Sequence, residues 1–120
     1  MVREVQPLSI SVYEDPTGAA PFEAWFEGLE ARAAARVTRA LSRLERGVGD
    51  LEPVGAGVSE LRIDYGPGYR VYLGQDGARL VILLCAGTKQ RQQKDIRCAH
   101  GLWAEYKTRK AAGEQDDRRR

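Results

Sequence analysis

The stretch ELRIDYGPGYRVYL, residues 60–73, predicts the β-hairpin around which the rest of the chain is arranged. Apolar residues alternate with polar ones on both sides of a Gly-Pro-Gly turn at residues 66–68, the period of two half-buried strands. A three-residue connection would place Arg70 opposite Asp64. It would also gather five polar side chains on one face of the hairpin: Glu60, Arg62, Asp64, Arg70 and Tyr72.

The two arginines of this face have two interpretations. They form an anion-binding surface, or they only pair with neighbouring acids, Arg70 with Asp64 and Arg62 with Glu60 or Asp64. Arg62 beside Tyr72 also fits a cation–π contact that stabilises the sheet. The spacing of the residues is compatible with each of these arrangements.

The remaining periodicities predict a small α+β domain. Alternation indicates a strand at 8–13, and helical spacing indicates a short helix from Pro21 to Leu29, weakened by Gly28, and a second helix at 31–46. A glycine-rich loop at 47–57 precedes three antiparallel strands, 58–65, 69–74 and 79–86, of which the last is apolar from Leu80 to Ala86 and therefore central. A C-terminal helix from 92 to about 107 completes the domain, residues 1–107, and we expect the charged tail 108–120 to be disordered.

The predicted helix at 31–46 carries a stripe of arginines beside its apolar stripe. At 100° per residue these arginines fall within about 80° of arc. They are Arg32, Arg36, Arg39, Arg43 and Arg46. One interpretation is a solvated face next to the buried one; the other is a binding ridge for an acidic protein or for RNA.

Three further cations follow the apolar strand, where it gives way to the C-terminal helix: Lys89, Arg91 and Lys94. Antiparallel pairing of the last two strands would bring this junction near the turn at 66–68 and hence near Arg70. Free N–H groups at the start of the helix favour an anion at the same place. A polar connecting loop without a ligand is the alternative interpretation.

The composition limits the classes of function. A hydrophobic fraction of 42% and a charged fraction of 30% are typical of a soluble domain, and no apolar run reaches membrane-spanning length. Neither a secretory signal nor a disulfide framework is expected from the N-terminus and the two cysteines, so we expect a cytoplasmic protein. With His100 as the single histidine, a metal site is not expected, and neither a hydrolase motif nor a phosphate loop is found.

The segments GxGVSELRIDYGPGYRVYL, GQDG and LVILLCAGTKQRQQKDIRCAHGLW, with the helical run FEAWFEGLEARAAARVTRALSRLERGVGD, resemble a known family. They are similar to the RelE/ParE superfamily of type II toxins, and most of all to its HigB-like addiction module killer branch, which includes phage-derived relatives. The similarity spans residues 8–107, and it implies the RelE-like fold, with the element order predicted above. Relatives commonly have Gly-Gly-Asp-Lys where this chain has Ala-Gly-Thr-Lys at 86–89.

This resemblance implies a toxin of a type II toxin–antitoxin module, neutralised by a cognate antitoxin of the helix-turn-helix type. Many such toxins are mRNA endonucleases that act on translating ribosomes without metal or other cofactor; others inhibit DNA gyrase. An inert protein that only binds its antitoxin, and operator DNA only through it, is a third reading. If the protein is an endonuclease, we expect the two hairpin arginines to be free of acid partners. If it only binds its antitoxin, we expect acids to form ion pairs with them.

The family motif maps onto five positions of this chain, and the hairpin face and the charge pattern add Tyr72 and Lys94. The catalytic residues expected are Arg62 and Arg70, which would clamp the phosphate, and Lys89, which would act on the leaving oxygen or as a base. The substrate-binding residues expected are Tyr69, Tyr72, Gln92 and Lys94, with either tyrosine stacking on a base. No residue matches the C-terminal His or Tyr of some RNA-cutting relatives.

Overall fold

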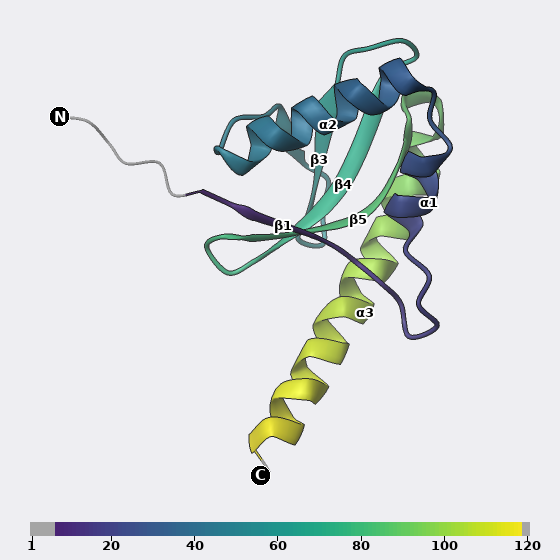
Figure 1. The fold of residues 1–120 in the computed structure, drawn as a ribbon. Helices are drawn as coiled ribbons and strands as arrows, with labels where there is room; N and C mark the ends of the chain where they lie inside the picture. The colour runs from purple at the N-terminus through teal and green to yellow at the C-terminus, as the bar shows by residue number, and fades with distance from the viewer. Residues whose placement is uncertain (1–6, 119–120) are drawn as a thin grey trace, which may run out of the picture.

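The computed structural model describes residues 7–118, with side chains through residue 113, and has one five-stranded sheet between helices (Figure 1). In chain order the elements are β1 Ser9–Val12, α1 Pro21–Glu27, α2 Ala31–Glu45, β2 Leu51–Pro53, β3 Val58–Ile63, β4 Tyr69–Asp76, β5 Leu80–Thr88, a 3₁₀ turn Lys89–Arg91 and α3 Gln92–Arg118. The predicted α+β class and the order of the predicted elements are confirmed. None of the helices described is long and apolar enough to cross a membrane.

The sheet has the strand order β1-β5-β4-β3-β2, with β5 and β4 at its centre. Strands β2 to β5 pair antiparallel as a meander, and β1 joins β5 in parallel. The strand β2 lies inside the segment 47–57 that the sequence predicted to be a loop, so that prediction is wrong over Leu51–Pro53. Its residues are exposed, which is why no apolar alternation marks them.

Two cores lie on opposite faces of the sheet, so β5 is covered on both sides, as predicted. On one face α1 and α2 pack against the sheet, and Ala33, Val37 and Leu44 form the buried stripe of α2. On the other face α3 packs against the sheet through Ala99 and Trp103. The sheet residues of this second core are Val58, Tyr72, Ile82, Leu84 and Cys85.

The hairpin of β3 and β4 has a longer connection than predicted. Ile63 pairs with Tyr69 and Arg62 with Arg70, so the chain turns through the five residues 64–68. Gly66 and Gly68 adopt positive φ values of 56° and 82°, which lets the backbone turn tightly without strain. The predicted pairing of Arg70 with Asp64 is therefore wrong, but the register differs by an even number of residues. The predicted division of side chains between the two faces survives for this reason.

The last helix continues beyond its predicted end at Lys107, and α3 runs to Arg118. The predicted helix end at about Lys107 is therefore too early, and of the predicted tail 108–120, residues 119–120 lie outside the described part. Residues 108–118 contain no proline and several strong helix formers. Contacts to β4 and to the segment after β1 hold the start of the extension, since Lys110 Nζ donates to Asp76 at 2.6 Å and an Arg109 nitrogen donates to the Glu14 carbonyl at 2.7 Å.

Candidate functional site

The polar face of the hairpin is covered where we expected it to be open. The first turns of α3 lie over it, so Glu60 is 3% exposed, Tyr72 is fully buried and the Arg70 side chain is 13% exposed. Sequence alternation identified the face correctly but assigned it to solvent. The result is a semi-enclosed polar cluster between β3, β4 and the start of α3.

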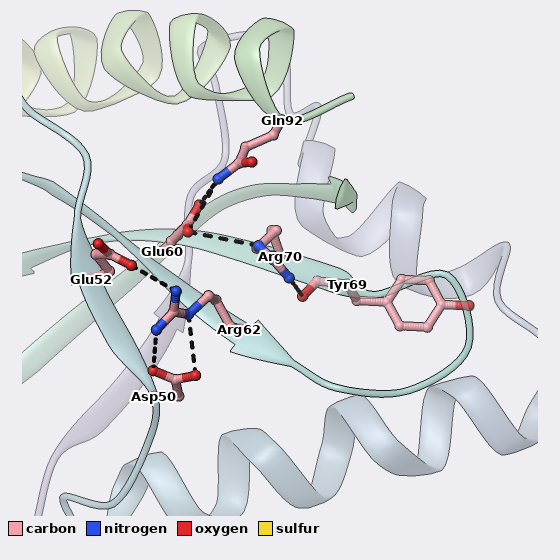
Figure 2. A network of polar contacts seen from close by, with 7 residues as sticks. All are labelled: Asp50, Glu52, Glu60, Arg62, Tyr69, Arg70 and Gln92. Atoms are coloured by element: carbon pink, nitrogen blue, oxygen red, sulfur yellow. Dashed lines mark hydrogen bonds and ion pairs between the residues drawn. The ribbon is translucent and has the colours of Figure 1, made fainter. Parts of the chain in front are cut away.

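A network of Glu60, Arg70 and Gln92 forms the centre of this cluster (Figure 2). The Gln92 side-chain amide donates to both carboxylate oxygens of Glu60, at 2.9 and 3.2 Å. Arg70 Nε lies 3.6 Å from Glu60 Oε1, an ion pair too long for a hydrogen bond, and another Arg70 nitrogen donates to the Tyr69 carbonyl at 3.3 Å. The predicted site residues Arg70 and Gln92 are thus brought together, with Glu60 between them.

The guanidinium of Arg70 retains unused hydrogen-bonding capacity. Its Nε is buried and has no hydrogen-bond partner among the described residues. A buried donor without a partner costs free energy that a bound anion would recover. The Glu60 carboxylate accepts its hydrogen bonds from Gln92. It therefore attracts the Arg70 guanidinium electrostatically but accepts no hydrogen bond from it.

Lys89 enters the site from the end of β5. Its backbone N–H donates to the Gly68 carbonyl at 2.9 Å, and a Cβ added to Gly68 would lie 3.6 Å from Lys89 Cβ and 3.8 Å from Arg70 Nη1. The predicted convergence of the β5 end with the hairpin turn and Arg70 is therefore confirmed. Lys89 and Lys94 are exposed, so two cations remain accessible at this end of the sheet.

Arg62 belongs to a different group of side chains. It donates to both carboxylate oxygens of Asp50, at 2.8 and 3.1 Å, and lies 2.7 Å from Glu52. Figure 2 shows its guanidinium turned toward β2, away from that of Arg70. Hydrogen bonding to Arg62 lowers the pKa of Asp50. The expected pairing of Arg62 with Glu60 or Asp64 is wrong, because the unpredicted strand β2 brings two other acids alongside.

Neither tyrosine of the predicted site presents an open ring. Tyr69 points to the α1 and α2 side, where it meets Trp25 edge-on at 5.7 Å and stacks on Tyr65 at 6.5 Å. Tyr72 lies under α3, and its hydroxyl has no partner among the described residues. Burial raises the pKa of Tyr72, with further contributions from Glu60 and Asp95. Stacking of an RNA base on either ring does not fit this arrangement.

Asp95 is a buried acid of the cluster that sequence reasoning missed. It is 8% exposed, its Oδ2 has no partner among the described residues, and a Cβ on Gly87 would lie 2.0 Å from that oxygen. Burial raises the pKa of Asp95, while Arg91 and Lys94 lower it. The only sequence signal was an acid in the first turn of a helix, which is usually a solvated partner of the helix dipole.

We expect Asp95→Asn to raise the free energy of unfolding at pH 7.5 by about 1 kcal/mol, because a buried unpaired charge is removed. Since the folded state raises the pKa of Asp95 above its ordinary value of 3.8, protonation stabilises the fold. The difference in free energy of unfolding between the variant and the unsubstituted protein therefore decreases as the pH falls toward 3.8. Urea titrations between pH 4 and 7.5 measure this, with exposed Asp64→Asn as control. A gain that does not change with pH contradicts the assignment.

Residues 24–100 match the family model described as Phage derived protein Gp49-like (DUF891). This range contains all seven predicted site residues and most of the sheet. The chain is also 48% identical over 80 residues to a Haemophilus influenzae protein described as an uncharacterized protein. That alignment covers 65% of this chain and 81% of the relative.

Proposed function

The chain belongs to the family of Gp49-like phage-derived proteins, which are RelE/HigB-like toxins, and from this premise we propose that it is a metal-independent mRNA endonuclease acting on translating ribosomes. A cognate antitoxin of the helix-turn-helix type would neutralise its activity. The protein would contact operator DNA only through this antitoxin. All of these partners are in the cytoplasm. The observation that carries the proposal is the Arg70 guanidinium, whose Nε has no hydrogen-bond partner among the described residues and whose Nη1 lies across Gly68 from exposed Lys89.

The proposed reaction is RNA cleavage by its own 2′-hydroxyl. A bond forms between the 2′ oxygen and phosphorus while the bond from phosphorus to the 5′ oxygen breaks. Arg70 stabilises the charge that builds on the phosphoryl oxygens, and Lys89 gives a proton to the leaving 5′ oxygen. The 2′-hydroxyl proton passes to solvent. Glu60, fixed by Gln92, acts as a positioning residue that holds the Arg70 guanidinium toward the opening.

Arg62 joins this site only after its ion pairs with Asp50 and Glu52 open. These pairs are exposed, with 39% of the Arg62 side chain accessible, and exposed ion pairs contribute little to stability because water screens them. An RNA phosphate would compete with them at low cost. Lys94, on the exposed face of α3, is proposed to contact the RNA strand beyond the cleaved bond.

The acid partners of Arg62 and Arg70 support a second candidate, a protein that only binds its antitoxin. Both guanidinium groups already lie next to acids instead of a substrate phosphate. Arg62 pairs with Asp50 and Glu52, and Arg70 pairs with Glu60. We rank this candidate below the endonuclease because only Arg62 is hydrogen-bonded to its acids. Gyrase inhibition, which the resemblance to the wider RelE/ParE superfamily also implies, is the third candidate.

Expression without antitoxin distinguishes the three readings. We expect growth arrest in which protein synthesis falls before DNA synthesis, with new mRNA ends within open reading frames on primer extension. Arg97→Gln, an exposed change on α3, serves as a control and should be equally toxic. DNA synthesis falling first with an SOS response would establish gyrase inhibition, and unimpaired growth would establish the inert module.

A further inference from the structure

The arginines of α2 form a continuous row on its surface, which we call the α2 ridge: Arg32, Arg36, Arg39, Arg43 and Arg46. All five are exposed. With a rise of 1.5 Å per residue, the row is about 21 Å long. The ridge lies on the opposite side of the sheet from α3 and its polar cluster (Figure 1).

The charge of the α2 ridge is not balanced within the described part of the chain. None of its five arginines forms an ion pair with an acid there; Arg36 lies over the Tyr65 ring at 4.9 Å. Neighbouring arginines three and four residues apart repel each other and cost helix stability, about 0.2–0.5 kcal/mol per pair. A face needed only for solubility would alternate acids with bases, so the row indicates an anionic ligand.

The surroundings of the ridge favour a nucleic acid over a protein. A protein interface needs several buried apolar anchors, but the exposed large hydrophobic residues of the described chain are Val48 and Leu51. Both lie outside α2, and Val48 shares a hollow with Arg43 at one end of the ridge. Small residues flank the arginines instead, and a shallow hollow is lined by Ala35, Thr38, Ser42, Arg39, Arg43 and Arg46. A phosphate backbone binds such a surface through charge alone.

We propose that the α2 ridge binds the phosphate backbone of single-stranded RNA, independently of the polar cluster and of any cleavage. The Arg36 end of the ridge meets Tyr65 in the hairpin connection. The same connection carries Gly68, whose carbonyl accepts from the Lys89 backbone. A strand bound along the ridge would therefore reach the end of the sheet at which Lys89 lies, while the rest of the polar cluster is on the other face. Guanidinium groups suit this role because each contacts two phosphate oxygens.

The test measures equilibrium binding to a 24-nucleotide 2′-O-methyl oligouridine, which the proposed reaction cannot cleave, by fluorescence anisotropy between 50 and 300 mM salt. Arg39→Gln/Arg43→Gln is compared with Arg79→Gln/Arg97→Gln, which removes the same charge from exposed positions outside α2. We expect the α2 variant alone to lower the slope of log affinity against log salt by about 1.4, two phosphate contacts at 0.7 each. Its affinity at 100 mM salt should fall about tenfold or more.

Each other result overturns the proposal. Equal slope changes in both variants would show a response to net charge only, and an unchanged slope would place the RNA elsewhere. Tighter binding of a polyglutamate peptide than of the RNA, with the same dependence on Arg39 and Arg43, would identify an acidic protein as the partner. Because the probe is not cleaved, these outcomes are independent of the proposed endonuclease activity.

Discussion

Arg70→Ala is expected to slow mRNA cleavage on translating ribosomes by about 10²–10³-fold, the usual loss when a donor to the transition-state charge is removed. Arg70 is the cation whose buried Nε has no hydrogen-bond partner in the described chain, and it lies beside Lys89 across the Gly68 turn. Primer extension on a defined message in a purified translation system measures the rate. Full activity in a folded Arg70→Ala protein would remove this residue from the site.

The same substitution is also expected to destabilise the fold, which the sequence did not indicate. An outward hairpin arginine would give up a surface pair of about 0–1 kcal/mol. In the structure, however, Glu60 is 3% exposed and Arg70 is its ion-pair partner. Truncating Arg70 leaves a buried carboxylate with Gln92 alone, and breaking a buried pair costs about 3–5 kcal/mol.

A double variant separates the two effects. Glu60→Gln/Arg70→Ala removes both charges, so its free energy of unfolding should recover most of the loss while cleavage stays at the level of Arg70→Ala. Arg70→Lys keeps the positive charge, but an ammonium group cannot contact two phosphate oxygens at once as a guanidinium does. This variant should keep the free energy of unfolding and have a cleavage rate between those of the unsubstituted protein and Arg70→Ala. If the double variant regains activity together with stability, Arg70 acts only through folding and the catalytic assignment fails.

Much of the site's composition could be predicted from the sequence because strand periodicity survives errors of register. An even shift of the hairpin left Arg62, Arg70 and Tyr72 on their predicted face. Antiparallel pairing likewise carried Lys89 to the hairpin turn, since a central apolar strand must run back beside its neighbour. These inferences used only the period of two and the direction of the chain.

What covers that face could not be predicted, because alternation separates two faces without showing which of them is buried. Tyr72 belongs to the second core, and Glu60, its cross-strand partner, is also buried; only the packing of α3 reveals this. The partners of Arg62 were missed for a related reason. Asp50 and Glu52 lie in or beside a three-residue exposed edge strand, whose sequence LEP has no strand periodicity.

The packing of α3 therefore controls the polar cluster, and Trp103→Ala should destabilise the protein by about 3–5 kcal/mol. Trp103 is 6% exposed and stacks on Tyr106 with ring centroids 5.1 Å apart. Its indole fills the space above two glycines: a Cβ on Gly74 would lie 2.4 Å from the ring, and one on Gly57 2.9 Å. Truncation to Ala leaves a cavity that these backbones cannot close.

Urea denaturation of Trp103→Ala measures this loss, with Gly101→Ala as the matched control in the same helix. A Cβ on Gly101 meets nothing within 4 Å, so that change should stabilise α3 by about 0.5–1 kcal/mol through helix propensity. Because α3 also carries Gln92, weakened docking should free the Glu60 carboxylate to compete for Arg70 and so lower cleavage before global unfolding. A loss below 1 kcal/mol would mean that α3 docks mainly through other contacts, such as those of Tyr106 and Lys110 with Asp76.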